Sequence, residues 1–120
     1  MTRAHPERVR ECLQHIVEAI DRASGYVDGM DAAAFQRDTR TQDAVIRSLQ
    51  IVGEAANKAR VADSDLQSSS PEIPWDVMYG MRNRIIHDYF EVDLEVVSQT
   101  LQRDLPVLRT QIVQLLARLS

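Results

Sequence analysis

Apolar side chains recur at alternating spacings of four and three residues along the long stretches of this chain. They do so from Val9 to Ala23, from Val45 to Ala59 and from Leu94 to Leu119. Such spacings place apolar side chains on one face of an α-helix, and no segment shows the strict alternation of a half-buried β-strand. Only four glycines and four prolines interrupt the 120 residues. The pattern therefore predicts an all-α fold.

Start signals divide the chain into four main helices. Pro6 fits the first turn of one helix, a second runs from Asp38 to Arg60, and Pro74 opens a third. Asp93 caps the last helical segment. Together with short additional helices, these elements predict an antiparallel helical bundle that forms one domain over residues 1–120. Its core is expected to include four residues of the third helix, namely Trp75, Met78, Met81 and Ile85.

Shorter features are expected between these helices. Asp31 can cap a short helix that carries Phe35 into the core, and the serine-rich stretch between residues 62 and 73 is expected to be a loop. Pro106 cannot lie inside a straight helix. Either the helix kinks there, or Asp104 caps a new helix with Pro106 in its first turn, which we favour.

The segment Gly53-Glu54-Ala55-Ala56 gives the second helix a small-residue surface at its middle. Such a surface lets another backbone approach closely. Glu54 is then either a surface carboxylate, which is slightly favoured, or an inward one. Its role and that of Asp38 stay open.

Composition and charge restrict the functions that the chain can have. The formal net charge of −4 does not favour nonspecific binding of nucleic acid, so any RNA contact must be local. Cys12 is the only cysteine, which excludes an internal disulfide, and His5, His15 and His87 lack zinc-ligand spacing. No apolar run approaches the roughly 20 residues of a membrane span, and no signal-peptide core is present. A cytoplasmic protein without metal or cofactor is expected.

Residues 81–90 concentrate the side chains that can do chemistry. Arginine fits phosphate oxygens with a planar fork of donors, and histidine can take and give a proton near neutral pH. Cleavage of RNA without a metal needs a base, an acid and a fixed positive charge. Arg82 and His87 are therefore candidate catalytic residues.

Two arginine groups accompany this stretch. Arg37, Arg40 and Arg47 form one group, and Arg82 and Arg84 form the other. Together they could line one positive groove, although a solvated face of mixed charge explains the first group equally well.

Helix geometry separates the two candidate catalytic residues. Arg82 and His87 are five positions apart, which corresponds to about 140° around a helix axis, so they do not share a face. Three arrangements would bring them together. The long Arg82 side chain wraps around the helix, the helix ends near His87, or a second copy of the chain supplies half of the site across a twofold axis.

The sequence Arg-Asn-Arg-Ile-Ile-His-Asp-Tyr at residues 82–89 resembles the Arg-x4-His-x-Tyr signature of the HepT-like toxins. These toxins are a branch of the HEPN superfamily of all-helical ribonucleases. The resemblance covers nearly the whole chain, because residues 41–47, 53–55, 74–75 and 104–106 are also similar to this family. It implies a HEPN-like helical domain that forms a homodimer.

The resemblance also implies roles for single residues. Arg82 would bind the scissile phosphate, His87 would act as base or acid, and Asn83 would orient the pair or the RNA substrate. Two copies of the motif would meet at the dimer interface, where the two His87 side chains would divide the base and acid roles. Metal-independent cleavage would leave a 2′,3′-cyclic phosphate and a 5′-hydroxyl.

Tyr89 resembles the acceptor onto which a MntA-like minimal nucleotidyltransferase, the antitoxin of the pair, transfers AMP. The added negative charge beside Arg82 and His87 would compete with RNA. One alternative is a non-catalytic helical dimer that binds and regulates a nucleotidyltransferase, and another is a plain helical scaffold. In those cases His87 meets the negative end of the helix dipole, and Arg84 and Asp88 form an ordinary i,i+4 pair.

Overall fold

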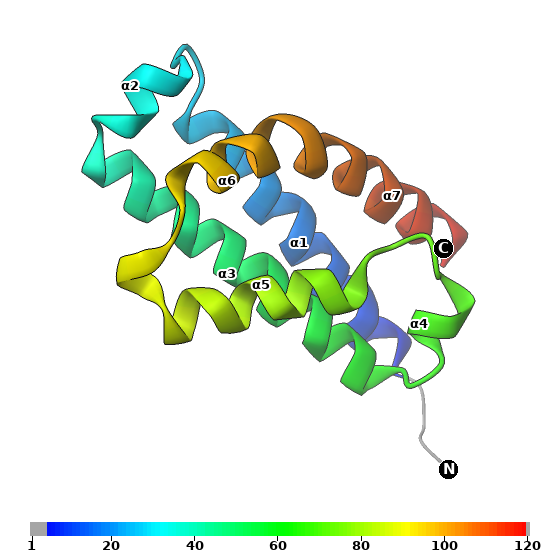
Figure 1. The fold of residues 1–120 in the computed structure, drawn as a ribbon. Coiled ribbons are helices and arrows are strands. Elements are labelled where there is room, and N and C mark those ends of the chain that lie inside the picture. The colour runs from blue at the N-terminus through cyan, green and yellow to red at the C-terminus, as the bar shows by residue number, and fades with distance from the viewer. Residues whose placement is uncertain (1–4, 120) are drawn as a thin grey trace.

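Long helices form where the apolar spacing predicted them, and a computed structural model describes residues 5–119 apart from the side chain of Phe90 (Figure 1). The four longest helices are α1 (Pro6–Tyr26), α3 (Thr39–Ala62), α5 (Trp75–His87) and α7 (Leu105–Arg118). Between them lie α2 (Ala32–Gln36), α4 (Leu66–Ser69), the 3₁₀ helix η1 (Tyr89–Glu91), α6 (Leu94–Gln99) and the π-helical turn η2 (Thr100–Asp104). No strand occurs within residues 5–119, so the predicted all-α bundle is confirmed.

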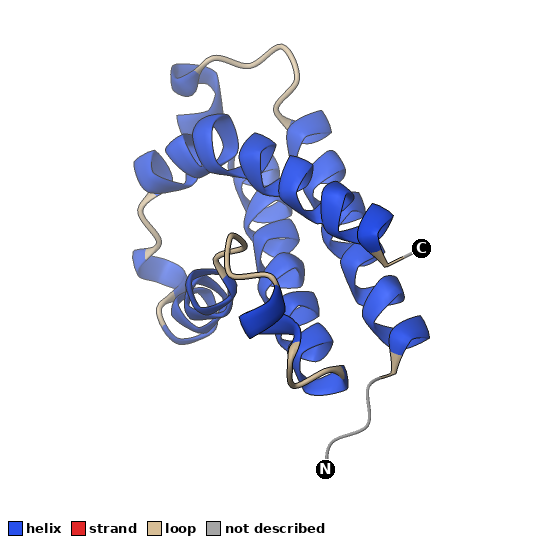
Figure 2. Ribbon diagram, turned by 90° about the vertical axis from the view of Figure 1, so that its right-hand side faces the viewer, coloured by secondary structure: helices blue, strands red, loops and turns tan. Residues whose placement is uncertain are grey.

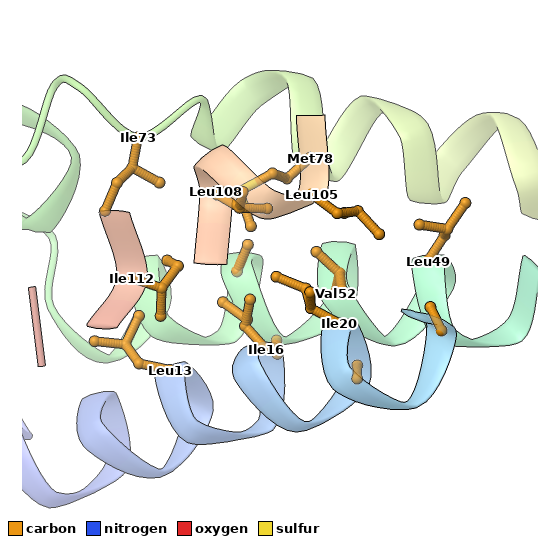
Figure 3. Packing of buried hydrophobic residues seen from close by; sticks show 14 of the residues in the cluster. Leu13, Ile16, Ile20, Leu49, Val52, Ile73, Met78, Leu105, Leu108 and Ile112 are labelled. Carbon is orange, nitrogen blue, oxygen red and sulfur yellow. The ribbon is translucent and has the colours of Figure 1, made fainter. Parts of the chain in front are cut away.

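The two longest helices, α1 and α3, lie side by side and run in opposite directions (Figures 1 and 2). Each buries one continuous face, since seven residues of α1 and ten of α3 are buried. Figure 3 shows these faces meeting Leu105, Leu108 and Ile112 of α7, with Met78 of α5 and Ile73 closing the core. The helix α5 packs chiefly on α3. Its place in the bundle is therefore set mainly by α3, with Met78 reaching the part of the core that α7 contributes (Figure 3).

Three aspartates cap helices, and local signals had predicted two of these caps, Asp31 and Asp93. Asp31 accepts a hydrogen bond from the backbone N–H of Ala34 at 2.7 Å, and Asp93 accepts one from that of Glu95 at 2.9 Å. Asp38 caps α3 through the N–H of Thr41 at 3.0 Å, which gives this carboxylate a structural role. Phe35 of α2 is buried in the core as predicted.

The stretch between residues 62 and 73 is not entirely a loop, which corrects the prediction. Leu66 is buried and begins the short helix α4, and Ser70 is the residue that directly follows this helix. The carbonyl of Ser70 accepts a hydrogen bond from the buried indole N–H of Trp75 at 3.0 Å. A single apolar anchor and one indole donor thus order a segment whose serines alone favour irregular structure.

The prediction of a helix start at Asp104 is confirmed in part, because α7 begins at Leu105 with Pro106 in its first turn, but the Asp104 side chain does not cap it. Asp104 has helical backbone angles and no side-chain cap bond, and helical structure continues from Leu94 to Arg118 through the wide turn η2. In this turn the N–H of Leu105 donates to the carbonyl of Thr100, five residues back. The extra residue in a π turn accommodates Pro106, which lacks an N–H, without breaking the helix.

Within the part of the chain that the structure describes, no helix is long and apolar enough to cross a membrane. The same range contains no group of three or more histidine, cysteine, aspartate or glutamate side chains arranged to hold a metal ion.

Candidate active site

The helices α3 and α5 approach most closely at Gly53. A Cβ atom added to Gly53 would collide with the Cβ of Arg82 and would lie 2.6 Å from the carbonyl oxygen of Met78. Real Cβ atoms essentially never approach another heavy atom this closely. The predicted close approach of a second backbone is therefore confirmed, and the partner backbone is the one that carries Arg82.

Arg82 is held on the α3 side of α5 by two polar groups and one ring. Its Nη1 donates to the Oδ1 of Asn83 at 2.8 Å, and its Nε lies 3.7 Å from the Oε1 of Glu54. The second distance makes an ion pair but not a hydrogen bond, and the buried Nε has no other partner within residues 5–119. The guanidinium carbon lies 5.6 Å from the centre of the Tyr79 ring, a cation–π distance. With its side chain 28% exposed, Arg82 is anchored but still reaches solvent.

Glu54 is the acidic partner of this arginine. Its side chain is 31% exposed, and its Oε1 also accepts a hydrogen bond from the Nε2 of Gln50 at 3.2 Å. The alternative in which Glu54 points toward the neighbouring helix is thus the observed one. Glu54 also keeps part of the surface position of the favoured alternative, and the absence of a side chain at Gly53 brings Arg82 within its reach.

His87 is the last residue of α5, so the helix ends at the candidate base, as one of the three proposed arrangements requires. The backbone leaves the helix at Asp88, whose N–H donates to the carbonyl of Arg84 at 2.8 Å. The imidazole is exposed and makes no hydrogen bond or ion pair with the residues described. Arg82 is directed to Glu54 and Asn83, so the wrap-around arrangement is not present, and no hydrogen bond joins Arg82 to His87 among the described residues.

Tyr89 begins η1 directly after the end of α5. Its hydroxyl donates a hydrogen bond to the Oδ1 of Asp43 on α3 at 2.6 Å, a contact between residues 46 positions apart. This bond, together with some desolvation, raises the pKa of Tyr89 above its ordinary value. The phenol is 42% exposed, so it is also accessible from solvent.

A polar row on α3 accompanies these residues, and the sequence reasoning did not identify it. The α3 polar row consists of Asp43, Arg47, Gln50 and Glu54. Two of its members contact the candidate site, since Asp43 binds Tyr89 and Glu54 binds Arg82. The signal was available in the sequence, because spacings of four, three and four residues place polar side chains on one helix face just as they place apolar ones.

Two expectations about the arginines are corrected by the structure of α5. Arg84 lines a groove between α5 and the α6–α7 segment, whereas Arg82 faces α3. The two arginines therefore do not share one positive groove with Arg37, Arg40 and Arg47, because two positions on a helix turn a side chain by about 200°. The expected Arg84–Asp88 pair is not formed either, since the ion pairs of the described residues do not include it.

The groove beside Arg84 has a volume of about 1010 Å³ and is lined by both apolar and acidic residues. Its exposed apolar residues include Val77 on α5, Val96 on α6 and Val107 on α7. Asp88, the residue that follows His87, lies at its edge. The open apolar surface therefore extends to the end of α5 at which His87 is located.

The site thus combines an anchored guanidinium, an exposed imidazole at a helix end and a phenol hydrogen-bonded to a carboxylate. A guanidinium can bind a phosphate oxygen and stabilise negative charge, while an imidazole can transfer a proton. This set of groups suits chemistry at a phosphodiester.

Comparison with known proteins agrees with this chemistry. Residues 16–115 match the family model described as ribonuclease HepT-like. A protein of Thermococcus cleftensis named probable ribonuclease HepT is 38% identical over 109 residues, which cover 91% of this chain and 93% of that protein. A protein of Methanocaldococcus jannaschii is 30% identical over 116 residues, and its name assigns it provisionally to the RNases. The similarity covers 96% of this chain and 97% of that protein.

A protein of Caldanaerobacter subterraneus subsp. tengcongensis, also assigned provisionally to the RNases by its name, is 28% identical over 109 residues. That similarity covers 91% of this chain and 95% of the relative. No solved structure matches the chain significantly. The match of the family model over most of the chain, together with relatives of this coverage, shows that the chain belongs to the HepT-like ribonuclease family.

Proposed function

We propose that this chain is the toxin of a toxin–antitoxin pair, a metal-independent endoribonuclease that uses Arg82 and His87 in a homodimer. The observation that carries the proposal is the position of the signature in the fold. Arg82 is held by Glu54 of α3 and by Asn83 and Tyr79 of its own helix, and the exposed His87 lies at the end of that helix. Membership of a ribonuclease family gives these residues a reaction to perform.

The proposed reaction is an intramolecular displacement at an RNA phosphate. His87 of one subunit takes the proton of a 2′-hydroxyl, and the 2′-oxygen attacks phosphorus while Arg82 stabilises the negative charge on the phosphorane. The second subunit supplies its own His87, which protonates the departing 5′-oxygen. The products are a 2′,3′-cyclic phosphate and a 5′-hydroxyl. Asn83 positions the guanidinium through the 2.8 Å hydrogen bond.

The proposed reaction uses two His87 side chains, so it requires a second copy of the chain. The groove between α5 and the α6–α7 segment offers a surface for that copy, since Val77, Val96 and Val107 expose apolar side chains along it. A copy seated there would stand beside Asp88 and hence close to the end of α5 that carries His87. Burial of such apolar residues is what stabilises dimers of this kind.

Tyr89 is the proposed acceptor of AMP from a cognate minimal nucleotidyltransferase, which acts as the antitoxin. Its exposed hydroxyl lies in η1, directly after the helix that carries Arg82 and His87. A tyrosyl phosphodiester there would add a negative charge near the phosphate-binding arginine and would compete with RNA. The substitution Tyr89→Phe should cleave RNA but gain no AMP, as checked by intact mass after incubation with the partner and ATP. An adduct on that variant would place the acceptor elsewhere.

The test of the proposed nuclease compares wild type, His87→Ala and the control His15→Ala, which removes an exposed histidine of α1. Each protein is checked by mass for an existing AMP adduct and incubated with labelled RNA in EDTA. Wild type and the control should cleave with cyclic-phosphate ends, and His87→Ala should not. Absence of cleavage by unmodified, dimeric wild type on several RNAs would favour the alternative of a non-catalytic dimer that regulates a nucleotidyltransferase.

Subunit mixing tests whether the two His87 side chains share one site. If they divide the acid and base roles, an equal mixture of wild type and His87→Ala subunits should retain about a quarter of the wild-type activity after exchange, because only wild-type homodimers are complete. Two independent sites would instead retain about half. Sedimentation of Val96→Glu, which places a charge on the groove, should show loss of the dimer. A persistent dimer would place the interface elsewhere.

A further inference from the structure

The hydrogen bond between Tyr89 and Asp43 has no part in the proposed cleavage of RNA. It joins the 3₁₀ helix η1 to the first half of α3, and its oxygen–oxygen distance is 2.6 Å. Asp43 is exposed and forms no ion pair with any described cation, including Arg47 one turn further along α3. The carboxylate is thus directed to the phenol rather than to a neighbouring charge.

A neutral phenol is a poor nucleophile, and transfer of a nucleotide to it requires removal of its proton. A phenol of ordinary pKa keeps its proton at neutral pH, and the hydrogen bond to Asp43 raises the pKa of Tyr89 further. The proton must therefore leave while the new bond forms, and a base must already be in place to receive it. A general base has to lie within about 2.6–3.2 Å of the oxygen that it deprotonates, and the Oδ1 of Asp43 meets this condition.

We propose that Asp43 is the general base for nucleotidyl transfer to Tyr89, an inference that rests on the modification proposed above. The phenolic oxygen attacks the α-phosphorus of a nucleoside triphosphate bound by the partner enzyme, and the bond from that phosphorus to the bridging oxygen of the β-phosphate breaks. Pyrophosphate leaves, and the phenolic proton passes to the Oδ1 of Asp43. The acid formed then loses this proton to water.

The transfer also removes the contact that prepared it. After modification the Tyr89 oxygen has no hydrogen to donate, and the new phosphodiester carries a negative charge that the Asp43 carboxylate repels. The hydrogen bond between α3 and η1 therefore exists only before transfer. Asp43 thus activates the Tyr89 hydroxyl before transfer, and after transfer its charge favours separation of the modified Tyr89 from α3.

The experiment measures single-turnover transfer of AMP to the adduct-free chain by intact mass, with the partner nucleotidyltransferase and ATP. Replacement of the base in Asp43→Asn should slow transfer by roughly 10²- to 10⁴-fold at pH 7, the range expected for loss of a general base. The control Asp21→Asn changes another exposed aspartate that accepts hydrogen bonds from one side chain, that of Arg109, and should transfer AMP at the wild-type rate. Asp43→Glu should recover part of the lost rate.

The pH profile separates a base from a structural contact. The wild-type rate should become constant once the carboxylate is ionised, whereas the rate of Asp43→Asn should rise with pH toward ionisation of the phenol. A slower rate with an unchanged pH profile would assign Asp43 a structural role and overturn the proposal, as would a wild-type rate in Asp43→Asn. If wild type acquires no AMP, or Tyr89→Phe does, the modification itself is wrong and the inference fails with it.

Discussion

The two sides of α5 meet the rest of the molecule in opposite ways. On the α3 side, contact is so close that only glycine fits at position 53, and Arg82 is held there by Glu54. On the side of α6 and α7, an open groove of about 1010 Å³ remains, and a Cβ added to Gly80 would meet nothing within 4 Å. The position of the candidate site therefore depends chiefly on α3, which matched substitutions on the two sides can test.

The largest expected effect is on stability and comes from the buried side of α5. Trp75 is 1% exposed and donates its indole N–H to the carbonyl of Ser70, so Trp75→Ala should lower the free energy of unfolding by about 3–5 kcal/mol. Val77 follows two residues later on the opposite, groove side of α5 and is 70% exposed. Val77→Ala should therefore change the free energy of unfolding by less than about 0.5 kcal/mol. Urea unfolding measures both, with each substitution made in the Val96→Glu background so that the proposed dimer surface does not contribute. Similar losses for both variants would mean that the groove side also anchors α5.

A smaller effect is expected from the glycines, and here the sign distinguishes the two sides. Gly53→Ala should destabilise the chain by about 1–3 kcal/mol despite the better helix propensity of alanine, because the new Cβ collides with Arg82 and Met78. Gly80→Ala faces open space within α5 and should stabilise the chain by about 0.5–1 kcal/mol. RNA cleavage should fall only in Gly53→Ala, because only that change displaces Arg82. A stabilised and fully active Gly53→Ala would contradict the close contact.

The smallest effect concerns a charge at the beginning of α5. Hydrogen bonds from Arg60 of α3, and then from Gln67, lower the pKa of Asp76 below its ordinary value of 3.8. Because the folded-state pKa is the lower one, the stabilisation is present above pH 3.8 and is lost as the pH falls through the folded-state value. Asp76→Asn should thus unfold at a slightly lower temperature than wild type at pH 7.

In acid that difference should disappear, and thermal unfolding followed by circular dichroism between neutral and acidic pH checks it. Asp88→Asn is the matched control at the other end of α5, where the aspartate lines the groove and makes no ion pair within residues 5–119. This control should not lower the unfolding temperature at pH 7. A pH-independent deficit of Asp76→Asn would show that its amide perturbs packing instead.

Local signals predicted the parts of the fold that depend on local physics. The caps Asp31 and Asp93 and the buried stripe of α3 follow from residues a few positions apart. The π turn and the helix α4 were missed, because a proline inside a helix and a serine-rich segment each allow several backbone solutions. Tertiary packing selects among them.

The candidate site was predictable as a list of residues but not as an arrangement. The signature identified Arg82, His87, Asn83 and Tyr89 within one short stretch. The direction of Arg82 toward Glu54 depends on the distance between α3 and α5. The contact of Tyr89 with Asp43 joins residues 46 positions apart, and spacing along one helix carries no information about such a pair.

Gly53 also has a consequence for inheritance. It has no side chain and takes part in no reaction step, yet every amino acid that a single-base change in a glycine codon can introduce carries a Cβ. Each such change would push α5 away from α3 at Arg82, the proposed phosphate-binding residue. A genetic selection for loss of RNA cleavage should therefore recover substitutions of Gly53 alongside those of Arg82 and His87. A residue without a functional group is thus expected to be among the positions most sensitive to inactivating mutation.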